Sequence, residues 1–347
     1  MKERYFAASN SSEGFCSYYD DVFNLQKLYK IFVIKGGSGT GKAFFMKEIA
    51  KTAELYGFSV RYIYCSSDSE SLDGIIINEQ KIAVLDGTSP HVYEPKYIGA
   101  VEVFVNLADF LDEKILTASR KIIERISNEK KLGFEKVYRK LKAYQVLTQN
   151  IETLILPCLK FEKIKKYAQR FSEGIEKEDG IDEHLLTRSI GMRGLSSFDT
   201  YLEKSKIYYE INDYFESAHF LMREIYSNLK SKGANLQISN NPITKNRIDV
   251  LCAPSSGLTF EIGNRMENDF RLINMKRFVD NDEIIKIRHE YRAIARVRDS
   301  VLDLALAEFE KIKKSHFLLE EIYGSAMNFA AKEQFTREFC NKIFEKN

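Results

Sequence analysis

The segment with the clearest chemistry is a glycine-rich run that ends in a lysine, with the spacing Gly-x4-Gly-Lys. Glycines let a backbone turn tightly, so that successive N–H groups point inward at an anion. The helix that follows adds its positive N-terminus, and the lysine adds a point charge at the β- and γ-phosphates. The predicted nucleotide-binding residues are Gly36, Gly37, Ser38, Gly39, Thr40, Gly41, Lys42 and Ala43.

The elements on both sides of this run fit a phosphate loop. Residues 30–35 (KIFVIK) are apolar and partly β-branched, which predicts a buried strand. Residues 44–56 have helical spacing, and Gly57 is a natural terminator for that helix. A glycine-rich turn without a ligand is the alternative. A dinucleotide-binding loop fits less well, because the glycine spacing is not Gly-x-Gly-x-x-Gly and Lys42 would have no role.

Ala43 stands where a phosphate loop carries serine or threonine, whose hydroxyl ligates Mg²⁺. Alanine has no oxygen to offer. A magnesium ion bound with ATP or GTP would therefore rely on waters, on the substrate phosphates and on one carboxylate. The sequence predicts nucleotide binding with a weakened Mg²⁺ site, and slow or absent hydrolysis.

Residues 82–86 (IAVLD) predict a buried strand that ends in a carboxylate. In phosphate-loop proteins such an aspartate holds Mg²⁺ directly or through water, which makes Asp86 both a metal-ligand and a catalytic candidate beside Lys42. His91 follows in the string TSPH and is a third catalytic candidate, placed to contact the γ-phosphate or to position water. The alternatives are an ordinary strand end and a solvated loop histidine.

Two further polar residues follow the strand predicted at 59–65. Ser66 and Asp68 are candidate metal ligands or pocket residues. Both follow the end of a predicted strand, and ligands of open α/β sheets bind beyond the carboxyl ends of the strands.

The composition is that of an ordinary globular protein, with 44% hydrophobic and 29% charged residues in 347. A net charge of +2 creates no strong field, so no nucleic-acid partner is indicated. No apolar run is long enough for a membrane span, and the N-terminal residues lack the apolar core of a signal peptide. Five scattered cysteines without a CxxC pair favour a reducing cytoplasm.

Strands and helices alternate in the first third of the chain, which predicts an α/β fold with a parallel sheet like that of phosphate-loop NTPases. Residues 113–180 are rich in Lys, Glu, Leu and Ile, and we expect them to form a long helical hairpin projecting from the sheet domain. Residues 283–346 have the same composition and helical periodicity. The string FEKIKK occurs at 161–166 and at 309–314, a match that lysine-rich helices also produce by composition.

The sequence also predicts an internal repeat, and the alternative is one α/β domain followed by an unrelated C-terminal half. FFMKEI at 44–49 matches FLMREI at 220–225 at four of six positions, and the same spacing aligns Gly57 with Gly233.

The repeat predicts a duplicated fold whose second copy has lost its phosphate loop. Residues 212–218 (NDYFESA), which align with 36–42, contain no glycine and no lysine. We therefore expect a nucleotide-binding domain at 1–185, which includes the helical hairpin, and a degenerate pseudo-domain at 186–347, which ends in helices.

Several strings together resemble a known family: YFAASNSSEGF near the start, then KGGSGTGKA, CSSDSESLDG, AVLDGTSPH and EPKYIGAVEVFVNLADF. They are similar to the tandem P-loop ATPases of Firmicute-type bacteria, in which two P-loop halves follow one another, each with a helical excursion. The resemblance implies that Gly36–Lys42 is the phosphate loop and Asp86 the acidic strand end. Ala43 and the segment 212–218 depart from the family pattern, so the chain resembles a degenerate member.

Three functions remain open at the level of sequence. The first is a cytoplasmic ATP- or GTP-binding protein with one site, which is a weak or inactive NTPase. The second is a nucleotide-gated or nucleotide-independent adaptor that holds a protein partner through its helical hairpins. The third is a small-molecule kinase, since kinases use the same loop.

Overall fold

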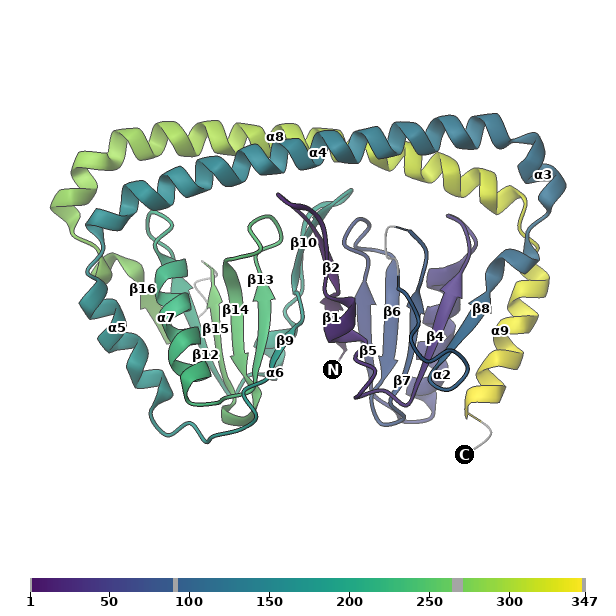
Figure 1. Cartoon of the computed structure of the whole chain (residues 1–347), viewed down its shortest axis with the longest axis horizontal. Coiled ribbons are helices and arrows are strands. Elements are labelled where there is room, and N and C mark those ends of the chain that lie inside the picture. The colour runs from purple at the N-terminus through teal and green to yellow at the C-terminus, as the bar shows by residue number, and fades with distance from the viewer. Residues whose placement is uncertain (1, 90–92, 264–270, 345–347) are drawn as a thin grey trace.

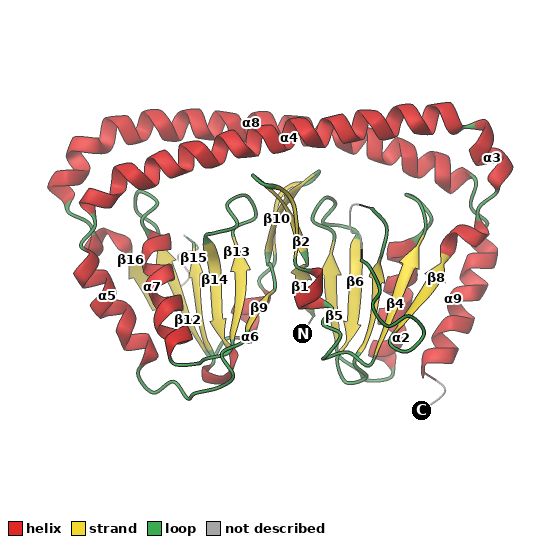
Figure 2. Cartoon of the chain, viewed as in Figure 1, coloured by secondary structure: helices red, strands yellow, loops and turns green. Residues whose placement is uncertain are grey.

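The computed structural model describes residues 2–89, 93–263 and 271–344, and these residues form a mixed α/β protein with two six-stranded sheets. Figure 1 shows the two sheets side by side, with a pair of very long helices running across both of them. Figure 2 shows that further helices lie at the outer flanks of the sheets. None of the described helices combines the length and the apolar character that a membrane span requires.

The first sheet has the order β1-β5-β6-β7-β4-β8. Its strands are β1 (Glu3–Phe6), β5 (Val60–Tyr64), β6 (Leu72–Ile77), β7 (Ile82–Asp86), β4 (Lys30–Lys35) and β8 (Glu102–Asn106). All neighbours are parallel except those of β6, which runs against β5 and β7. The expected purely parallel sheet is thus corrected at one strand. The cause is a tight turn from Asn78 to Lys81, which is too short for the crossover that a parallel pair needs.

The second sheet has the same order and the same strand directions, β9-β13-β14-β15-β12-β16. Its strands are β9 (Asp182–His184), β13 (Leu236–Asn240), β14 (Ile248–Ala253), β15 (Leu258–Ile262), β12 (Ile207–Asn212) and β16 (Arg271–Asn274). The register also agrees. Ile34, the fifth residue of β4, lies opposite Asp86, and Ile211, the fifth residue of β12, lies opposite Ile262. The connection from β12 to α7 is thus one residue shorter than that from β4 to α2, which the gap-free alignment of the two sequences does not show.

Each sheet carries a 14-residue helix after β4 or β12, the strand next to one edge of the sheet. These helices are α2 (Lys42–Leu55) and α7 (Ala218–Ser231), and their apolar faces are buried in the two main cores. Gly57 and Gly233 follow them with φ of 85° and 80°, as the repeat in the sequence predicts. The left-handed conformation at these positions explains why both are glycine.

The two long helices are α4 (Arg120–Ile155), which follows the short α3 (Glu113–Ala118), and α8 (Asn281–Ser325). They pack along each other, and the rings of Phe134 and Phe309 meet edge to face at 6.2 Å. We call this pair the helical roof. The predicted hairpin within 113–180 is therefore wrong in its pairing. The apolar stripe of a 36-residue helix needs a partner of similar length, and α8 supplies it.

The helices after the roof are exchanged between the halves. The chain turns at a 3₁₀ helix, Leu156–Cys158, which contains Pro157, and α5 (Phe161–Gln169) then packs on α7 of the second half. In the same way α9 (Phe329–Phe344) follows α8 and packs on α2 of the first half. Each sheet is thus covered by a helix that the other half of the chain delivers.

Two antiparallel hairpins cross where the halves meet. They are formed by β2 (Ala8–Ser11) with β3 (Gly14–Ser17) and by β10 (Arg188–Gly191) with β11 (Gly194–Ser197), and the short helices α1 (Tyr19–Val22) and α6 (Thr200–Lys204) follow them. The backbones of Phe6 and Leu186 exchange both hydrogen bonds. Beyond this point, the β10–β11 hairpin reaches the first half, where the Ser189 hydroxyl donates to the carbonyl oxygen of Ser66 at 2.8 Å.

Candidate functional site

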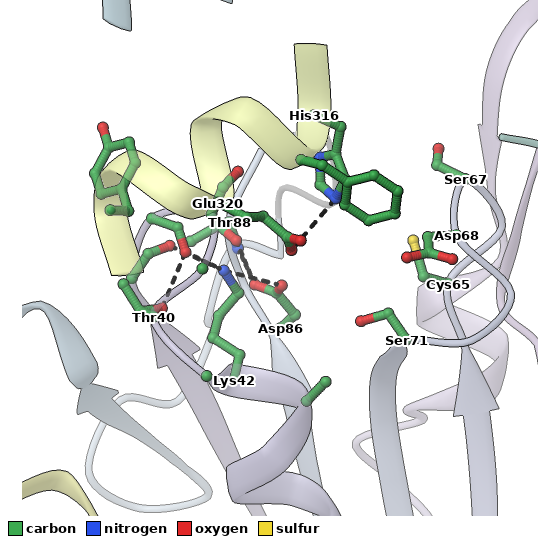
Figure 3. Close-up of a pocket in the computed structure, with 18 of the residues that line it drawn as sticks. Thr40, Lys42, Cys65, Ser67, Asp68, Ser71, Asp86, Thr88, His316 and Glu320 are labelled. Carbon is green, nitrogen blue, oxygen red and sulfur yellow. Dashed lines mark hydrogen bonds and ion pairs between the residues drawn. The ribbon is translucent and has the colours of Figure 1, made fainter. Parts of the chain in front are cut away.

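A cavity of about 1020 Å³ lies at the carboxyl ends of β4 and β7, beneath the helical roof. The segment Gly36–Lys42, which we call the glycine loop, forms one wall, and residues around Asp68 form another, as Figure 3 shows. Its lining comes from both halves of the chain, since Met192 of the β10–β11 hairpin and side chains of α4 and α8 also contribute.

The glycine loop has the backbone that an anion-binding turn requires. Gly39 and Gly41 have φ of 72° and 78°, and α2 begins directly afterwards at Lys42. The buried Thr40 hydroxyl donates to the carbonyl oxygen of Gly37 at 2.9 Å, which braces the turn from inside. No acidic residue lies in the first turn of α2, so the positive end of the helix dipole faces the loop uncompensated.

Lys42 and Asp86 are brought together, as the sequence predicts. The Lys42 ammonium lies 3.6 Å from the Asp86 carboxylate, and both side chains are mostly buried. The ammonium also donates to the carbonyl oxygens of Gly37 and Gly36, at 2.7 and 3.1 Å. Figure 3 shows this arrangement, in which Thr88 donates to the same carboxylate through its backbone N–H and its hydroxyl.

The other predicted site residues differ in their position relative to the cavity. Asp68 lines the cavity, but Arg193 of the β10–β11 hairpin pairs with it at 2.9 Å. Ser66 is buried and is not among the lining residues, because the hairpin covers it. His91 lies outside the described residues.

The helical roof adds side chains that sequence reasoning missed. Lys130 of α4 donates to Nδ1 of His316 of α8 at 3.0 Å, and Nε2 of His316 lies 3.4 Å from Glu320. All three line the cavity. Burial lowers the pKa of Lys130, and the nearby charge of Lys42 acts in the same direction. No motif marks these residues, since they lie far from the glycine loop in sequence.

The end of α8 rests directly on the glycine loop. A Cβ atom placed on Gly37 would lie 2.7 Å from the ring of Tyr323, and one on Gly39 would collide with the backbone of Glu320. Gly39 is therefore restricted to glycine by the backbone of α8 and by its positive φ, whereas a side chain at Gly37 would require the ring of Tyr323 to move.

The corresponding loop of the second half is Asn212–Ala218, at the end of β12. Here the chain itself supplies an anion. One carboxylate oxygen of Asp213 accepts hydrogen bonds from the N–H groups of Tyr214 and Ala218, at 2.8 and 2.9 Å. Burial raises the pKa of Asp213. The N-terminus of α7 is thus filled by a side chain of its own loop.

A charge network closes the rest of that region. Glu216 pairs with Arg247 and Arg298, and Arg247 also pairs with Glu152 of α4 at 2.7 Å. Nδ1 of His219 donates to the carbonyl oxygen of Glu216 at 2.8 Å. Burial, helped by the charge of Arg247, lowers the pKa of His219 to about 3, so this imidazole is neutral. The adjacent Glu152 does not charge it, because its carboxylate is already paired with Arg247.

Among the described residues, no group of three or more His, Cys, Asp or Glu side chains is arranged to hold a metal ion. Comparison of the chain with protein-family models, with curated proteins and with solved structures finds no match.

Proposed function

We propose that the chain binds one nucleoside triphosphate, ATP or GTP, with the glycine loop as its phosphate loop. The observation that carries the proposal is the juxtaposition at the start of α2. Two left-handed glycines, a helix N-terminus and the Lys42–Asp86 pair meet in one large cavity. Strand ends and helix N-termini with inward N–H groups suit phosphate, whereas a merely structural turn needs no lysine held beside a buried aspartate.

Each part of this site has a task toward the phosphates. The loop N–H groups bind their oxygens, and the helix dipole adds favourable potential. Lys42 exchanges its bonds to the carbonyl oxygens of Gly36 and Gly37 for bonds to phosphate. These carbonyls hold the ammonium near the loop before the ligand arrives.

The residues present fit a magnesium ion that arrives with the nucleotide. Mg²⁺ prefers oxygen ligands and keeps several waters, and here Asp86 and the adjacent Thr88 hydroxyl are the oxygens on offer. Bound there, the ion would neutralise phosphate charge. Ala43 contributes no oxygen, so a weak or inactive NTPase is the enzyme class we propose.

The second half is, in this proposal, a duplicated copy that has lost the site. Its sheet has the same strand order, and Asp213 takes the place of the anion at the start of α7. The chain is then a degenerate tandem P-loop protein of the bacterial cytoplasm.

A nucleotide-gated adaptor is a second candidate, favoured by the contact between α8 and the glycine loop. A ligand in the cavity would change the contacts that Tyr323 and Glu320 make with the glycine loop. Hydrogen exchange in α8 should then slow when ATP is added. Unchanged exchange despite saturating ATP would exclude gating through this helix.

The proposal is tested by equilibrium binding of ATP and GTP, with and without Mg²⁺. Lys42→Ala should weaken binding at least ~10-fold, because a charge-assisted contact of roughly 1.5–3 kcal/mol is lost. Lys51→Ala is the matched control, since Lys51 is exposed on the same helix. Equal affinities of wild type and Lys42→Ala, or no binding by the wild type, would refute the assignment.

A further inference from the structure

Lys130 is a largely buried cation that the glycine loop does not explain. It projects from α4 of the helical roof into the cavity and donates to Nδ1 of His316. Within residues 2–89, 93–263 and 271–344, no carboxylate lies close enough to form an ion pair with it. Burial outweighs the charge of Glu320, which favours the ammonium only from beyond ion-pair distance, so the pKa of Lys130 is lowered. A cation largely withdrawn from water with no ion-pair partner is costly, so its retention calls for an explanation.

Two other cations near the cavity are already neutralised. Lys42 has Asp86, and Arg193 has both Asp68 and Glu70. Lys332, whose ammonium lies beside Gly41, stands over the rings of Phe44 and Phe329. Of the described lysines that line the cavity, Lys130 is the one without an ion pair, and its charge remains available to a ligand. Its neighbour His316 is held by Glu320 at its other nitrogen, which leaves Nδ1 free to accept from the ammonium and to fix its direction.

We propose that Lys130 binds the terminal phosphate of the nucleoside triphosphate from the helical roof, while Lys42 binds the phosphates from the glycine loop. His316 is the positioning residue that orients Lys130. This inference rests on the proposed function and makes it more specific, because it assigns recognition of the third phosphate to α4.

The electrostatics of the cavity agree with this assignment. Burial lowers the pKa of Lys130, and the charge of Lys42 contributes to the same shift, so the two ammonium groups act within one cavity. A phosphate placed between them would be attracted by both and would relieve their mutual repulsion. A diphosphate seated on the glycine loop lacks the group that reaches the roof.

The test compares ATP with ADP in three variants. Lys130→Met should weaken ATP binding about 10-fold and ADP binding less than about 2-fold, because only the triphosphate carries the group that it contacts. His316→Gln should produce a smaller loss that is again confined to ATP. Lys131→Met is the matched control, since Lys131 is the adjacent, exposed lysine of α4, and it should change neither affinity.

Each other outcome separates the two proposals. Equal losses for ATP and ADP in Lys130→Met would make Lys130 a general support of the cavity and overturn the inference, as would unchanged ATP affinity. A wild type that binds neither nucleotide refutes the proposed function itself.

A second measurement on the wild type covers the case in which Lys130→Met does not fold. Amine acylation of Lys130, followed by mass spectrometry, should slow when ATP is added and stay unchanged with ADP. Lys131 should react equally in both. Equal protection of Lys130 by ATP and ADP would overturn the inference.

Discussion

The carboxylate of Asp213 accepts a hydrogen bond from the backbone N–H of Ala218, 2.9 Å away, at the first residue of α7. In the first half, the residue that corresponds to Ala218 is Lys42, the first residue of α2. One loop thus presents a cation to its cavity, whereas the other fills its own helix N-terminus with an anion. The two halves share a sheet topology and differ in the sign of the charge at the start of the helix, α2 or α7.

From this difference we expect one nucleotide per chain at saturation. A phosphate near α7 would have to displace the half-buried Asp213 carboxylate, which already accepts the N–H groups of Tyr214 and Ala218, and it would be repelled by that like charge. Isothermal titration with ATP should give a stoichiometry near one. In Lys42→Ala no residual tight site should remain, and a titration that shows two sites would contradict the prediction.

Replacing Ala43 should restore magnesium dependence. Ala43→Ser or Ala43→Thr adds an oxygen at the second residue of α2, next to the cavity, without altering the loop backbone. We expect weak Mg²⁺ dependence of ATP binding in the wild type and stronger dependence in the variants, measured by titrations with and without the ion. The rate of ATP hydrolysis should rise together with the Mg²⁺ dependence. A wild-type turnover of ~1 s⁻¹ or faster would show that Ala43 does not limit catalysis.

The buried His219 predicts a loss of stability in mild acid. Its pKa is about 3 in the folded chain, because burial excludes the charged form, and about 6.5 when unfolded. Between these values the unfolded chain binds one more proton, so the free energy of unfolding falls as the pH drops below 6.5. At pH 5, protonation of this histidine in the unfolded chain should lower the free energy of unfolding by about 2 kcal/mol.

Chemical denaturation at pH 7 and pH 5 tests this prediction on the wild type and His219→Gln. The glutamine does not titrate, so the drop between the two pH values should be smaller by about 2 kcal/mol in the variant. The prediction fails if both proteins lose the same stability.

The exchange of helices predicts that a residue late in the chain stabilises the first sheet. Phe339 of α9 is buried, and its ring lies 5.1 Å from Phe45 and 5.0 Å from Phe32. Phe339→Ala should lower the free energy of unfolding by about 3–5 kcal/mol through the cavity it leaves. Tyr29→Ala, at a side chain that is 75% exposed, is the control and should change stability by less than about 0.5 kcal/mol.

Hydrogen exchange in Phe339→Ala should locate the damage. We expect faster exchange in α2 and β4, which α9 covers, than in α7 and β12. Equal effects on both halves would mean that α9 acts on the molecule as a whole.

Local sequence patterns predicted the elements around the site well. The strand Lys30–Lys35, the helix after Lys42 and the strand ending at Asp86 are confirmed, because each depends on a short apolar run and a neighbouring glycine or carboxylate. The α/β class is confirmed in the same way. The antiparallel direction of β6 was missed, since a run of isoleucines indicates a strand but not its direction.

Partners far apart in the chain could not be predicted. Periodicity shows that a helix has an apolar stripe, but not which helix covers it, so the contact of α4 with α8 and the roof residue Lys130 were missed. The FEKIKK match is one of composition, as the sequence indicated: the copy at 161–166 begins α5, whereas the copy at 309–314 lies within α8.

The exchange of α5 and α9 has a consequence for biosynthesis. The core beneath the first sheet includes Phe339, Cys340 and Ile343, which leave the ribosome only after the entire second sheet has been made. Until then the outer face of α2 is uncovered, and the emerging chain exposes apolar surface that favours aggregation. Because these closing contacts join residues so distant in sequence, their loop-closure entropy makes the last step of folding slow. Chaperones that bind exposed apolar segments would act on the first half during that interval, and a ribosome stalled between α8 and α9 would hold a chain whose two halves are unequally finished.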